Sequence, residues 1–259
     1  MDIYKEIFFN IKKNINFNNY LQFLISYDLF LFTTFQDYTL NGTAIKQVEK
    51  IRDLGIILDS KWTFQDHIDM VISKSFRTLG LIKRITSHFT SLNTIVYLFK
   101  TLVIPNINYC SVIWSPYTND KFDRLNSIMK NFLRYASYKS GKPMEYNNHN
   151  YKEISLECNI YKVESIHKYN DVMFVLNNLK GSVISPDFQK NFKERDLIYD
   201  LRDPRPFQEE VQRKDFLYNS PIHRLRRRWN ILNQDCRNRL IDINIDGKTI
   251  LKEKIFKNF

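Results

Sequence analysis

The sequence predicts a mainly α-helical fold with a small β-hairpin near its N-terminus. Only six glycines and seven prolines occur among 259 residues, which argues against a turn-rich sandwich or barrel. Hydrophobic residues make up 43% of the chain and aromatic residues 15%, enough to build a core and too many for a disordered chain. Apolar residues recur at helical spacing from Thr63 onward, which completes the case for helices.

The first expected element is the hairpin. Residues 38–40 lead into Asn41-Gly42, a dipeptide that tolerates positive φ and favours a tight turn. Residues 43–48 would form the return strand. The next apolar run, from Asp53 to Asp59, is bounded by carboxylates and predicts a single buried strand.

Three helices with apolar stripes meeting in one core are expected next, at residues 63–87, 92–103 and 120–137. Thr63 should cap the first helix, with Asp66 as its capping-box partner. Ser91 should cap the second helix, and Pro105 should kink or end it. Asp120 should cap the third.

The second half of the chain gives weaker patterns. Residues 141–150 are polar and predict a boundary, and residues 163–179 predict a long amphipathic helix that Gly181 ends. Residues 185–212 carry prolines and predict an extended connector, whereas residues 221–232 predict a short helix. These patterns divide the chain into three regions: 1–60, 61–142 and 143–259.

The charge of the chain points to a polyanionic partner. The net charge is +11, and between Val71 and Met144 eleven basic residues stand against two acidic ones. Nucleic acid is the first partner to consider and an anionic membrane the second, with a merely soluble basic protein as the alternative. The candidate phosphate contacts are Lys74, Arg77, Lys83, Arg84, Lys121, Arg124, Lys130 and Arg134.

A second basic cluster consists of Arg224, Arg226, Arg227 and Arg228, followed by Trp229. One interpretation is a phosphate clamp with a stacking aromatic. The favoured interpretation places Leu225 and Trp229 on the buried face of a helix and leaves the arginines solvated. A nuclear-import signal is a third alternative.

Other chemistry is sparse in the sequence. Three widely separated cysteines predict neither a disulfide framework nor a metal site, and they favour an intracellular protein, nuclear or cytoplasmic. The five histidines are expected at the surface or partly packed. Residues 20–35 are apolar, but Asp28 interrupts them and a membrane span needs about 20 apolar residues. We therefore expect this segment to be buried in the fold and no membrane partner.

An ordered set of motifs between residues 38 and 134 resembles the region that follows the catalytic motifs in jockey-like non-LTR retrotransposon reverse transcriptases. The matching stretches are Tyr38-Thr-Leu-Asn-Gly, Val48 to Asp59, Trp62-Thr-Phe, Leu98 to Pro105, Tyr109 to Pro116 and Leu125 to Arg134. The resemblance implies a palm remnant at residues 1–60, a thumb-like helical domain at 61–142 and a C-terminal region at 143–259. It also implies that Leu54-Gly55 is the primer grip, although a buried strand with a bulge glycine explains the same two residues.

The catalytic aspartates of the family are missing. Its polymerase uses two adjacent aspartates and a third to hold two Mg²⁺ ions, and no Asp-Asp dipeptide occurs in this chain. Mg²⁺ is therefore expected only in a complete family member, and this chain needs no cofactor. The sequence predicts a truncated reverse-transcriptase-derived protein, inactive alone as an RNA-directed DNA polymerase, that retains binding to a template–primer backbone. The alternatives are a polymerase part that acts with a separately supplied palm and a non-enzymatic protein-interaction module.

Overall fold

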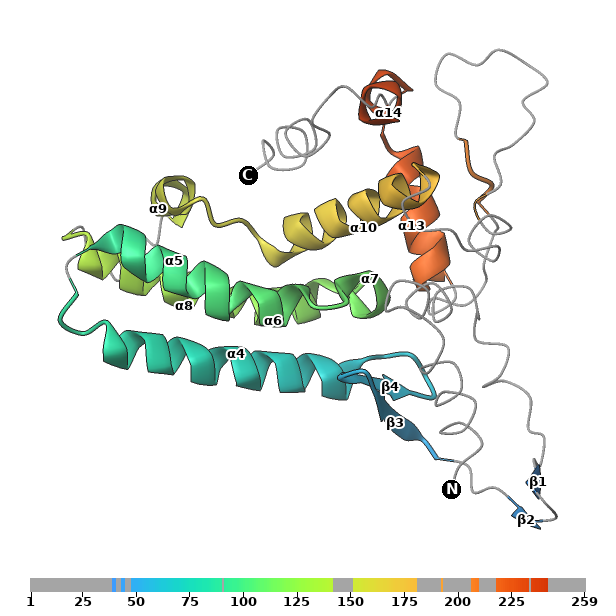
Figure 1. Cartoon of the computed structure of the whole chain (residues 1–259), viewed down its shortest axis with the longest axis horizontal. Coiled ribbons are helices and arrows are strands. Elements are labelled where there is room, and N and C mark those ends of the chain that lie inside the picture. The colour runs from blue at the N-terminus through green and yellow to red at the C-terminus, as the bar shows by residue number, and fades with distance from the viewer. Residues whose placement is uncertain are drawn as a thin grey trace. The chain divides into compact units, whose positions relative to one another are not determined.

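The computed structural model describes residues 39–40, 43–44, 48–89, 91–141, 151–180, 192, 206–209, 218–232 and 234–241. Helices dominate these residues, and the strands form two small antiparallel sheets of two strands each (Figure 1). The prediction of a mainly helical fold with a small hairpin near the N-terminus is confirmed.

The contacts of the chain group it into two compact units. The central unit is Phe64–Asn170 with Lys248–Phe259, and the composite unit is Met1–Thr63 with Asp171–Gly247. The three-region division made from the sequence stays a prediction. The boundary expected at residues 141–150 lies outside the described residues except for Gly141, as does most of the connector expected at 185–212.

The expected hairpin is present. Strands β1 (Thr39–Leu40) and β2 (Thr43–Ala44) pair antiparallel, with Leu40 opposite Thr43. This register leaves two residues between the strands, and the tight turn expected at Asn41-Gly42 lies outside the described residues. The return strand is described only as far as Ala44, because residues 45–47 lie outside the described part and residue 48 is not in a strand.

A second hairpin replaces the single strand predicted from Asp53 to Asp59. Strand β3 (Lys50–Asp53) pairs antiparallel with β4 (Ile56–Asp59), so Leu54 and Gly55 form the two-residue turn between them. Both have positive φ, 43° and 87°, as the mirror-image turns of tight hairpins require. The strand prediction was wrong at these positions because leucine gives no turn signal and pays about 1–2 kcal/mol in this conformation.

Helix α4 (Gln65–Ile85) begins two residues later than expected, and its N-cap is Phe64 instead of the predicted Thr63. The Thr63 hydroxyl donates to the Asp59 carboxylate at 3.2 Å, and the same carboxylate accepts the Thr63 backbone N–H at 3.0 Å. Phe64 is the N-cap, in a left-handed conformation, and its own side chain makes no capping hydrogen bond. Asp66 lies in the first turn, where its charge complements the helix dipole.

The second expected helix is confirmed together with both of its end signals. Helix α5 spans Leu92–Leu102, and the Ser91 hydroxyl accepts the Thr94 N–H at 3.4 Å as its cap. Pro105 lies in the first turn of the next helix, α6 (Ile104–Asn108), so the chain breaks just before the proline. The short α7 (Ser111–Trp114) follows, and α5, α6 and α7 lie in one row (Figure 1).

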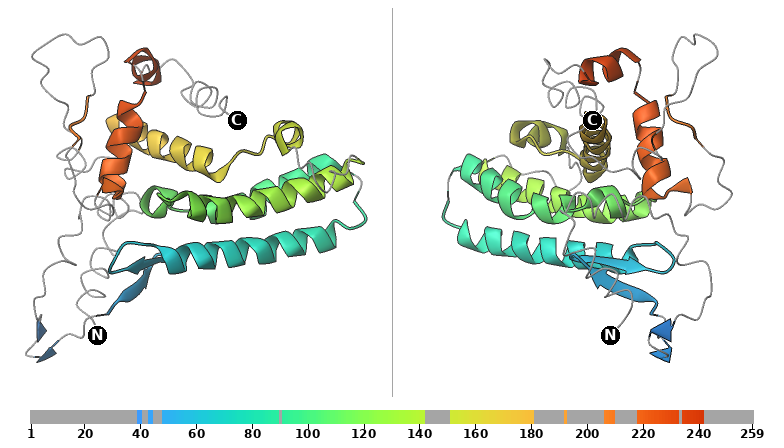
Figure 2. Two further views of the ribbon diagram at one scale, coloured as in Figure 1. Left: turned by 180° about the vertical axis from the view of Figure 1, so that it is seen from behind. Right: turned by 45° about the vertical axis from the view of Figure 1, so that its right-hand side comes forward.

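Helix α8 (Asn119–Lys139) completes the core of the central unit. Its N-cap is Thr118, so Asp120 is a first-turn residue and the prediction that it caps the helix is wrong. Helices α4, α5 and α8 lie side by side (Figure 2). The rings of Phe99 and Phe132 stack between α5 and α8 with their centroids 3.8 Å apart, and both are fully buried. The predicted meeting of apolar stripes in one core is confirmed.

Four more helices follow in the described part of the chain. They are α9 (Tyr151–Cys158), α10 (Val163–Leu179), α13 (Pro221–Asn230) and α14 (Gln234–Ile241). The helices expected at 163–179 and 221–232 are thereby confirmed, and Gly181 lies outside the described residues. None of the described helices has the length and apolar character to cross a membrane. The apolar segment at residues 20–35 also lies outside the described residues.

Candidate nucleic-acid interface

Basic side chains line the contact between α4 and α8, which we call the seam. Its residues are Lys83, Lys121, Arg124, Arg134 and Lys139. At one end Arg124 forms an ion pair with Asp69, with Nη2 2.5 Å from Oδ1. The Gln65 amide also donates to Asp69, and Lys121 lies close enough to act on it electrostatically. Burial alone would raise the pKa of Asp69, but the hydrogen bonds from Arg124 and Gln65 and the nearby positive charges lower it overall.

The other end of the seam is organised around Tyr135. Its hydroxyl lies 2.8 Å from the Thr86 hydroxyl. This hydrogen bond anchors the Tyr135 ring, on α8, to the end of α4. The ammonium groups of Lys83 and Lys139 lie 5.6 and 5.9 Å from the centroid of this ring. Lys139 also donates to the carbonyl oxygens of Ser87 and Phe89, at 2.5 and 3.3 Å.

Positive charges face one another at this end. Burial lowers the pKa of Lys83, and the charge of Arg134 lowers it further. Arg134 donates to the Tyr151 hydroxyl at 3.0 Å, and in the described part of the chain neither it nor Lys83 has a carboxylate partner. Lys83 and Lys139 therefore share one aromatic ring, with Arg134 close enough to act on Lys83, and no carboxylate among the described residues neutralises Lys83 or Arg134.

The eight predicted contacts do not share one surface. Lys74 and Lys83 are nine residues apart on α4, which is roughly half a turn out of phase at about 100° per residue, and Lys121 and Lys130 are related in the same way on α8. Lys83, Lys121 and Arg124 belong to the seam, and Arg134 joins it at its edge, because it acts electrostatically on Lys83 although it lies only four residues from Lys130 on α8. The other four lie exposed elsewhere on the central unit: Lys74, Arg77, Arg84 and Lys130.

Lys139 is a seam residue that the predicted site omitted. It lies 18 residues after Lys121, which is five full turns of an α-helix, so the two side chains occupy the same side of α8. That spacing was available in the sequence. The predicted primer-grip residues, Leu54 and Gly55, belong to the composite unit and form the turn between β3 and β4.

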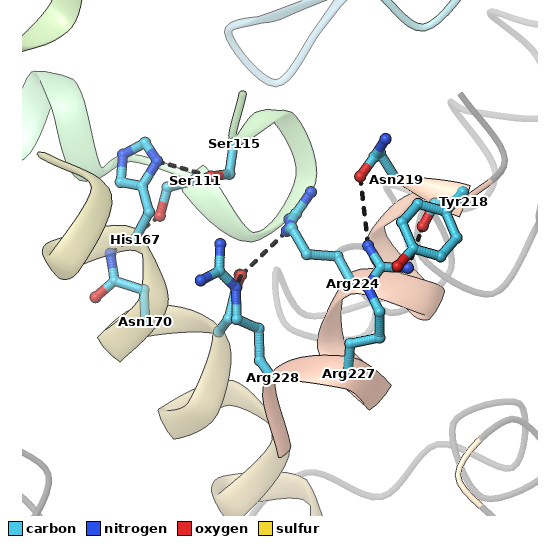
Figure 3. Close-up of polar contacts among 10 residues, drawn as sticks. Ser111, Ser115, His167, Asn170, Tyr218, Asn219, Arg224, Arg227 and Arg228 are labelled. Carbon is cyan, nitrogen blue, oxygen red and sulfur yellow. Dashed lines mark hydrogen bonds and ion pairs between the residues drawn. The ribbon is translucent and has the colours of Figure 1, made fainter. Parts of the chain in front are cut away.

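The arginine cluster of α13 is built into the composite unit (Figure 3). Leu225 and Trp229 are buried as expected, but Arg224 and Arg226 are only 5% and 9% exposed, so the expectation that the arginines are solvated is wrong for these two. Arg224 Nε donates to Asp171 Oδ2 at 3.0 Å, and Arg228 Nε lies 3.7 Å from the same oxygen.

Asp171 is the reason that two arginines can be held there. Its side chain is completely buried on α10, and burial raises the pKa of its carboxyl while the charges of Arg224 and Arg228 oppose that rise. A buried charge needs a partner, and these guanidinium groups supply it. Asp171 is 53 residues before Arg224 in sequence, so the residues around the cluster do not predict this ion pair.

The remaining two arginines of the cluster pack on aromatic rings. Arg227 lies 3.8 Å from the centroid of the Tyr218 ring and donates to the Tyr218 carbonyl and the Asn219 amide oxygen. Arg226 lies 5.9 Å from the ring of Phe192. All four arginines thus have contacts within the composite unit, which suits a structural role.

A buried histidine organises the core of the central unit. His167 Nε2 lies 3.1 Å from the Ile107 carbonyl oxygen, so this nitrogen donates and Nδ1 accepts from the Ser115 hydroxyl at 2.9 Å (Figure 3). The Trp114 ring meets the His67 and His167 rings edge to face. Both histidines are buried, contrary to the expectation of surface or partly packed positions. Because Ser115 is buried as well, this pair holds α7 to α10 and presents no nucleophile to solvent.

The remaining chemistry and the comparisons add no further site. Among the described residues, no group of three or more His, Cys, Asp or Glu side chains is placed to hold a metal ion. The three cysteines are free, and burial raises the pKa of Cys110 and Cys158 to about 11. Comparison with protein-family models, with curated proteins and with solved structures gives no match.

Proposed function

We propose that this chain is a nucleic-acid-binding protein derived from the post-catalytic region of a non-LTR reverse transcriptase. It holds a template–primer duplex by its phosphates along the seam, without sequence preference, and does not polymerise by itself. The observation that carries the proposal is the meeting of Lys83 and Lys139 on the Tyr135 ring, with Arg134 close enough to act electrostatically on Lys83 and no carboxylate partner among the described residues for Lys83 or Arg134.

The physical reason is electrostatic. Like charges that the fold holds near one another repel, and an approaching polyanion offsets that repulsion. Duplex DNA carries one charge per about 1.7 Å of its axis and releases condensed counterions when phosphates are neutralised. The resemblance of residues 38–134 to the thumb region makes a template–primer duplex the natural ligand of such a surface.

The seam is not uniform in strength. Arg124 is already paired with Asp69, and Lys121 lies near the same carboxylate. The end around Tyr135 should therefore bind phosphate more strongly than the end around Asp69. If about four seam residues engage a duplex together, log affinity should fall with log salt at a slope of roughly −3 to −4.

The test is the salt dependence of duplex binding, measured by fluorescence anisotropy of labelled duplexes of two unrelated sequences. The triple variant Lys83→Gln, Arg134→Gln, Lys139→Gln should flatten the slope by roughly 2 to 3 and weaken both duplexes alike. Binding that does not depend on salt, or an unchanged slope in this variant, contradicts the proposal.

A matched control separates the seam from general charge. The variant Lys61→Gln, Lys100→Gln, Lys180→Gln removes the same charge from three exposed lysines outside the seam. Its slope should stay close to that of the parent protein. A loss equal to that of the seam variant would mean that net charge, and not this surface, drives binding.

The absence of polymerase activity is tested separately. The purified chain should not extend an RNA-templated primer with Mg²⁺ or Mn²⁺ present, because the aspartates that hold the two metal ions are missing from the sequence. Incorporation above background that persists through removal of contaminating polymerases would contradict this part of the proposal.

A further inference from the structure

A groove of about 550 Å³ lies in the central unit between α8, α9 and the start of α10. Its volume is within the range of pockets that hold small ligands, roughly 300–1,000 Å³. Apolar side chains contribute much of its lining, among them Phe122, Met129, Leu133 and Ile160. Three lysines and two tyrosines also line it: Lys130, Lys152, Lys162, Tyr151 and Tyr161.

The walls of this groove are fixed by hydrogen bonds. The Asn126 amide oxygen accepts the Val163 N–H at 2.9 Å, which ties the start of α10 to α8. Ser155 closes the turn after α9, since its carbonyl accepts the Ile160 N–H at 2.9 Å and its hydroxyl donates to the Ile160 carbonyl. The groove is therefore formed before any ligand arrives.

The chemistry of the groove suits a flat ring that carries negative charge. Tyrosine rings beside an apolar floor offer stacking surfaces for nucleobases, and lysines at the same place meet the phosphates between them. Two carboxylates also line it, Asp123 and Glu164. Glu164 is neutralised by Lys168 at 2.9 Å, so positive charge prevails.

The groove is continuous with the seam through one residue. Arg134 acts electrostatically on Lys83 across the seam and donates to the Tyr151 hydroxyl at the groove. A nucleic acid held at the strong end of the seam therefore meets Tyr151 next. A folded duplex does not fit a cavity of this size, whereas an unpaired nucleotide does.

We propose that this groove binds one or two unpaired nucleotides of a strand that leaves the duplex held on the seam. Bases stack at Tyr151 and Tyr161, and phosphates meet the three lysines. This inference rests on the proposed function for the position of the duplex. The competing occupant is an acidic peptide, which the same lysines would attract.

The test compares a blunt duplex with the same duplex carrying a single-stranded overhang of about 4 nucleotides. The overhang should tighten binding by roughly five- to a hundred-fold, the equivalent of one stacked base. Tyr161→Leu should remove most of that gain, and Tyr161→Phe should keep it because the ring remains. An overhang that adds nothing, or a gain that Tyr161→Leu leaves intact, overturns the inference.

A charge variant covers the case in which Tyr161→Leu disturbs the fold. Lys152→Gln with Lys162→Gln changes two exposed side chains and should also reduce the overhang gain, whereas Lys61→Gln with Lys180→Gln should not. Equal losses in both pairs overturn the inference. A glutamate peptide that displaces the overhang more strongly than an equally long oligonucleotide does also overturns it, in favour of a peptide site.

Failure of the proposed function gives a different result. If the seam does not hold duplex, blunt-duplex binding keeps its salt slope in the Lys83, Arg134 and Lys139 variant. In that case a single-stranded oligonucleotide of about 15 nucleotides should still bind, with a dependence on Tyr161. If Tyr161→Leu changes the affinity neither for the overhang duplex nor for the oligonucleotide, the groove proposal is overturned and the proposed function is not.

Discussion

The basic residues of α4 and α8 lie at the surface of the central unit, whereas those of α13 are largely inside the composite unit. Lys74, Arg77 and Arg84 are exposed, but Arg224 and Arg226 are 5% and 9% exposed. On α4 and α8 the charges fall outside the apolar stripes. On α13 four arginines occupy five consecutive positions, and at about 100° per residue they must point to every side of the helix.

The difference shows that the spacing of charges decides their use more than their number does. A helix that buries one face and carries arginines on every face must bury some of those arginines. Arg224 meets Asp171 there, and Arg226 and Arg227 lie against aromatic rings. The central unit avoids this need because the cations of α4 and α8 fall outside the apolar stripes, which leaves the core to apolar side chains such as the stacked rings of Phe99 and Phe132. The central unit thus keeps these cations outside its apolar core, whereas the composite unit adds a buried ion pair to an apolar core that includes Leu225 and Trp229.

The largest expected effect tests the apolar half of this comparison. Phe132→Ala should lower the free energy of unfolding by about 3–5 kcal/mol, because the ring is fully buried and stacked on Phe99. Urea unfolding monitored by circular dichroism measures it. Tyr138→Ala on the same helix, where the side chain is 68% exposed, should change the value by no more than about 0.5 kcal/mol. Similar small changes in both variants would mean that the stripe is not the core.

Much of this core follows from the sequence. The 3-4-3 spacing of Phe122, Leu125, Met129 and Phe132 predicts the buried face of α8, and Ser91 and Pro105 predict the ends of α5. Capping at Thr63 and Asp120 was mispredicted, because the first helix starts later, with Phe64 as its N-cap, and the helix of Asp120 starts a residue earlier.

The candidate site is less predictable than the core. Periodicity placed the cations outside the apolar stripes, but it did not say which of them meet across two helices. The pairing of Arg124 with Asp69, 55 residues apart, and of Arg224 with Asp171 depends on tertiary contacts. The sequence did not predict the turn at Leu54, because leucine rarely adopts the positive φ that this turn requires.

The buried ion pair tests the other half of the comparison. Asp171→Asn leaves Arg224 and Arg228 without a counter-charge and should destabilise the protein by about 3 kcal/mol or more. Glu164→Gln is the matched control on the same helix, since its pair with Lys168 is 40% exposed on both sides and contributes about 0–1 kcal/mol. Equal unfolding midpoints for the two variants in urea would show that the arginines need no internal carboxylate.

A smaller effect is expected at the weak end of the seam. Asp69→Asn releases Arg124 from its ion pair and removes a negative charge, so duplex affinity should rise a few-fold and the salt slope should steepen by up to about 0.9. Stability at neutral pH should change by less than about 1 kcal/mol, because the side chains of Arg124 and Asp69 are 40% and 44% exposed. Anisotropy and urea unfolding on the same preparations measure the two quantities. An affinity that falls would place Asp69 in the binding surface itself.

The same variant has a pH signature. The folded state lowers the pKa of Asp69 from 3.8, so its contribution to stability is present above that value and lost as the pH falls through the folded pKa. The parent protein should lose this small contribution on acidification, and Asp69→Asn should not. Unfolding curves at a series of pH values below about 5 measure the difference. Parallel acid profiles would mean that the ion pair does not persist in solution.

The smallest expected effect separates surface charge from buried charge by salt. Lys83→Met removes one of the facing cations, which should stabilise the fold at low salt, and it also removes the contact with the Tyr135 ring, which should cost a similar amount. The net change should stay within about 0.5 kcal/mol.

Added salt screens repulsion between exposed charges but leaves a buried pair nearly untouched. The stability of Lys83→Met relative to the parent should therefore decline as salt rises, while that of Asp171→Asn should stay constant. Duplex affinity should fall several-fold in Lys83→Met, with the slope reduced by about 0.9. A loss above about 1 kcal/mol that salt does not alter would make Lys83 a structural cation like Arg224, and the seam would lose the residue on which its strong end depends.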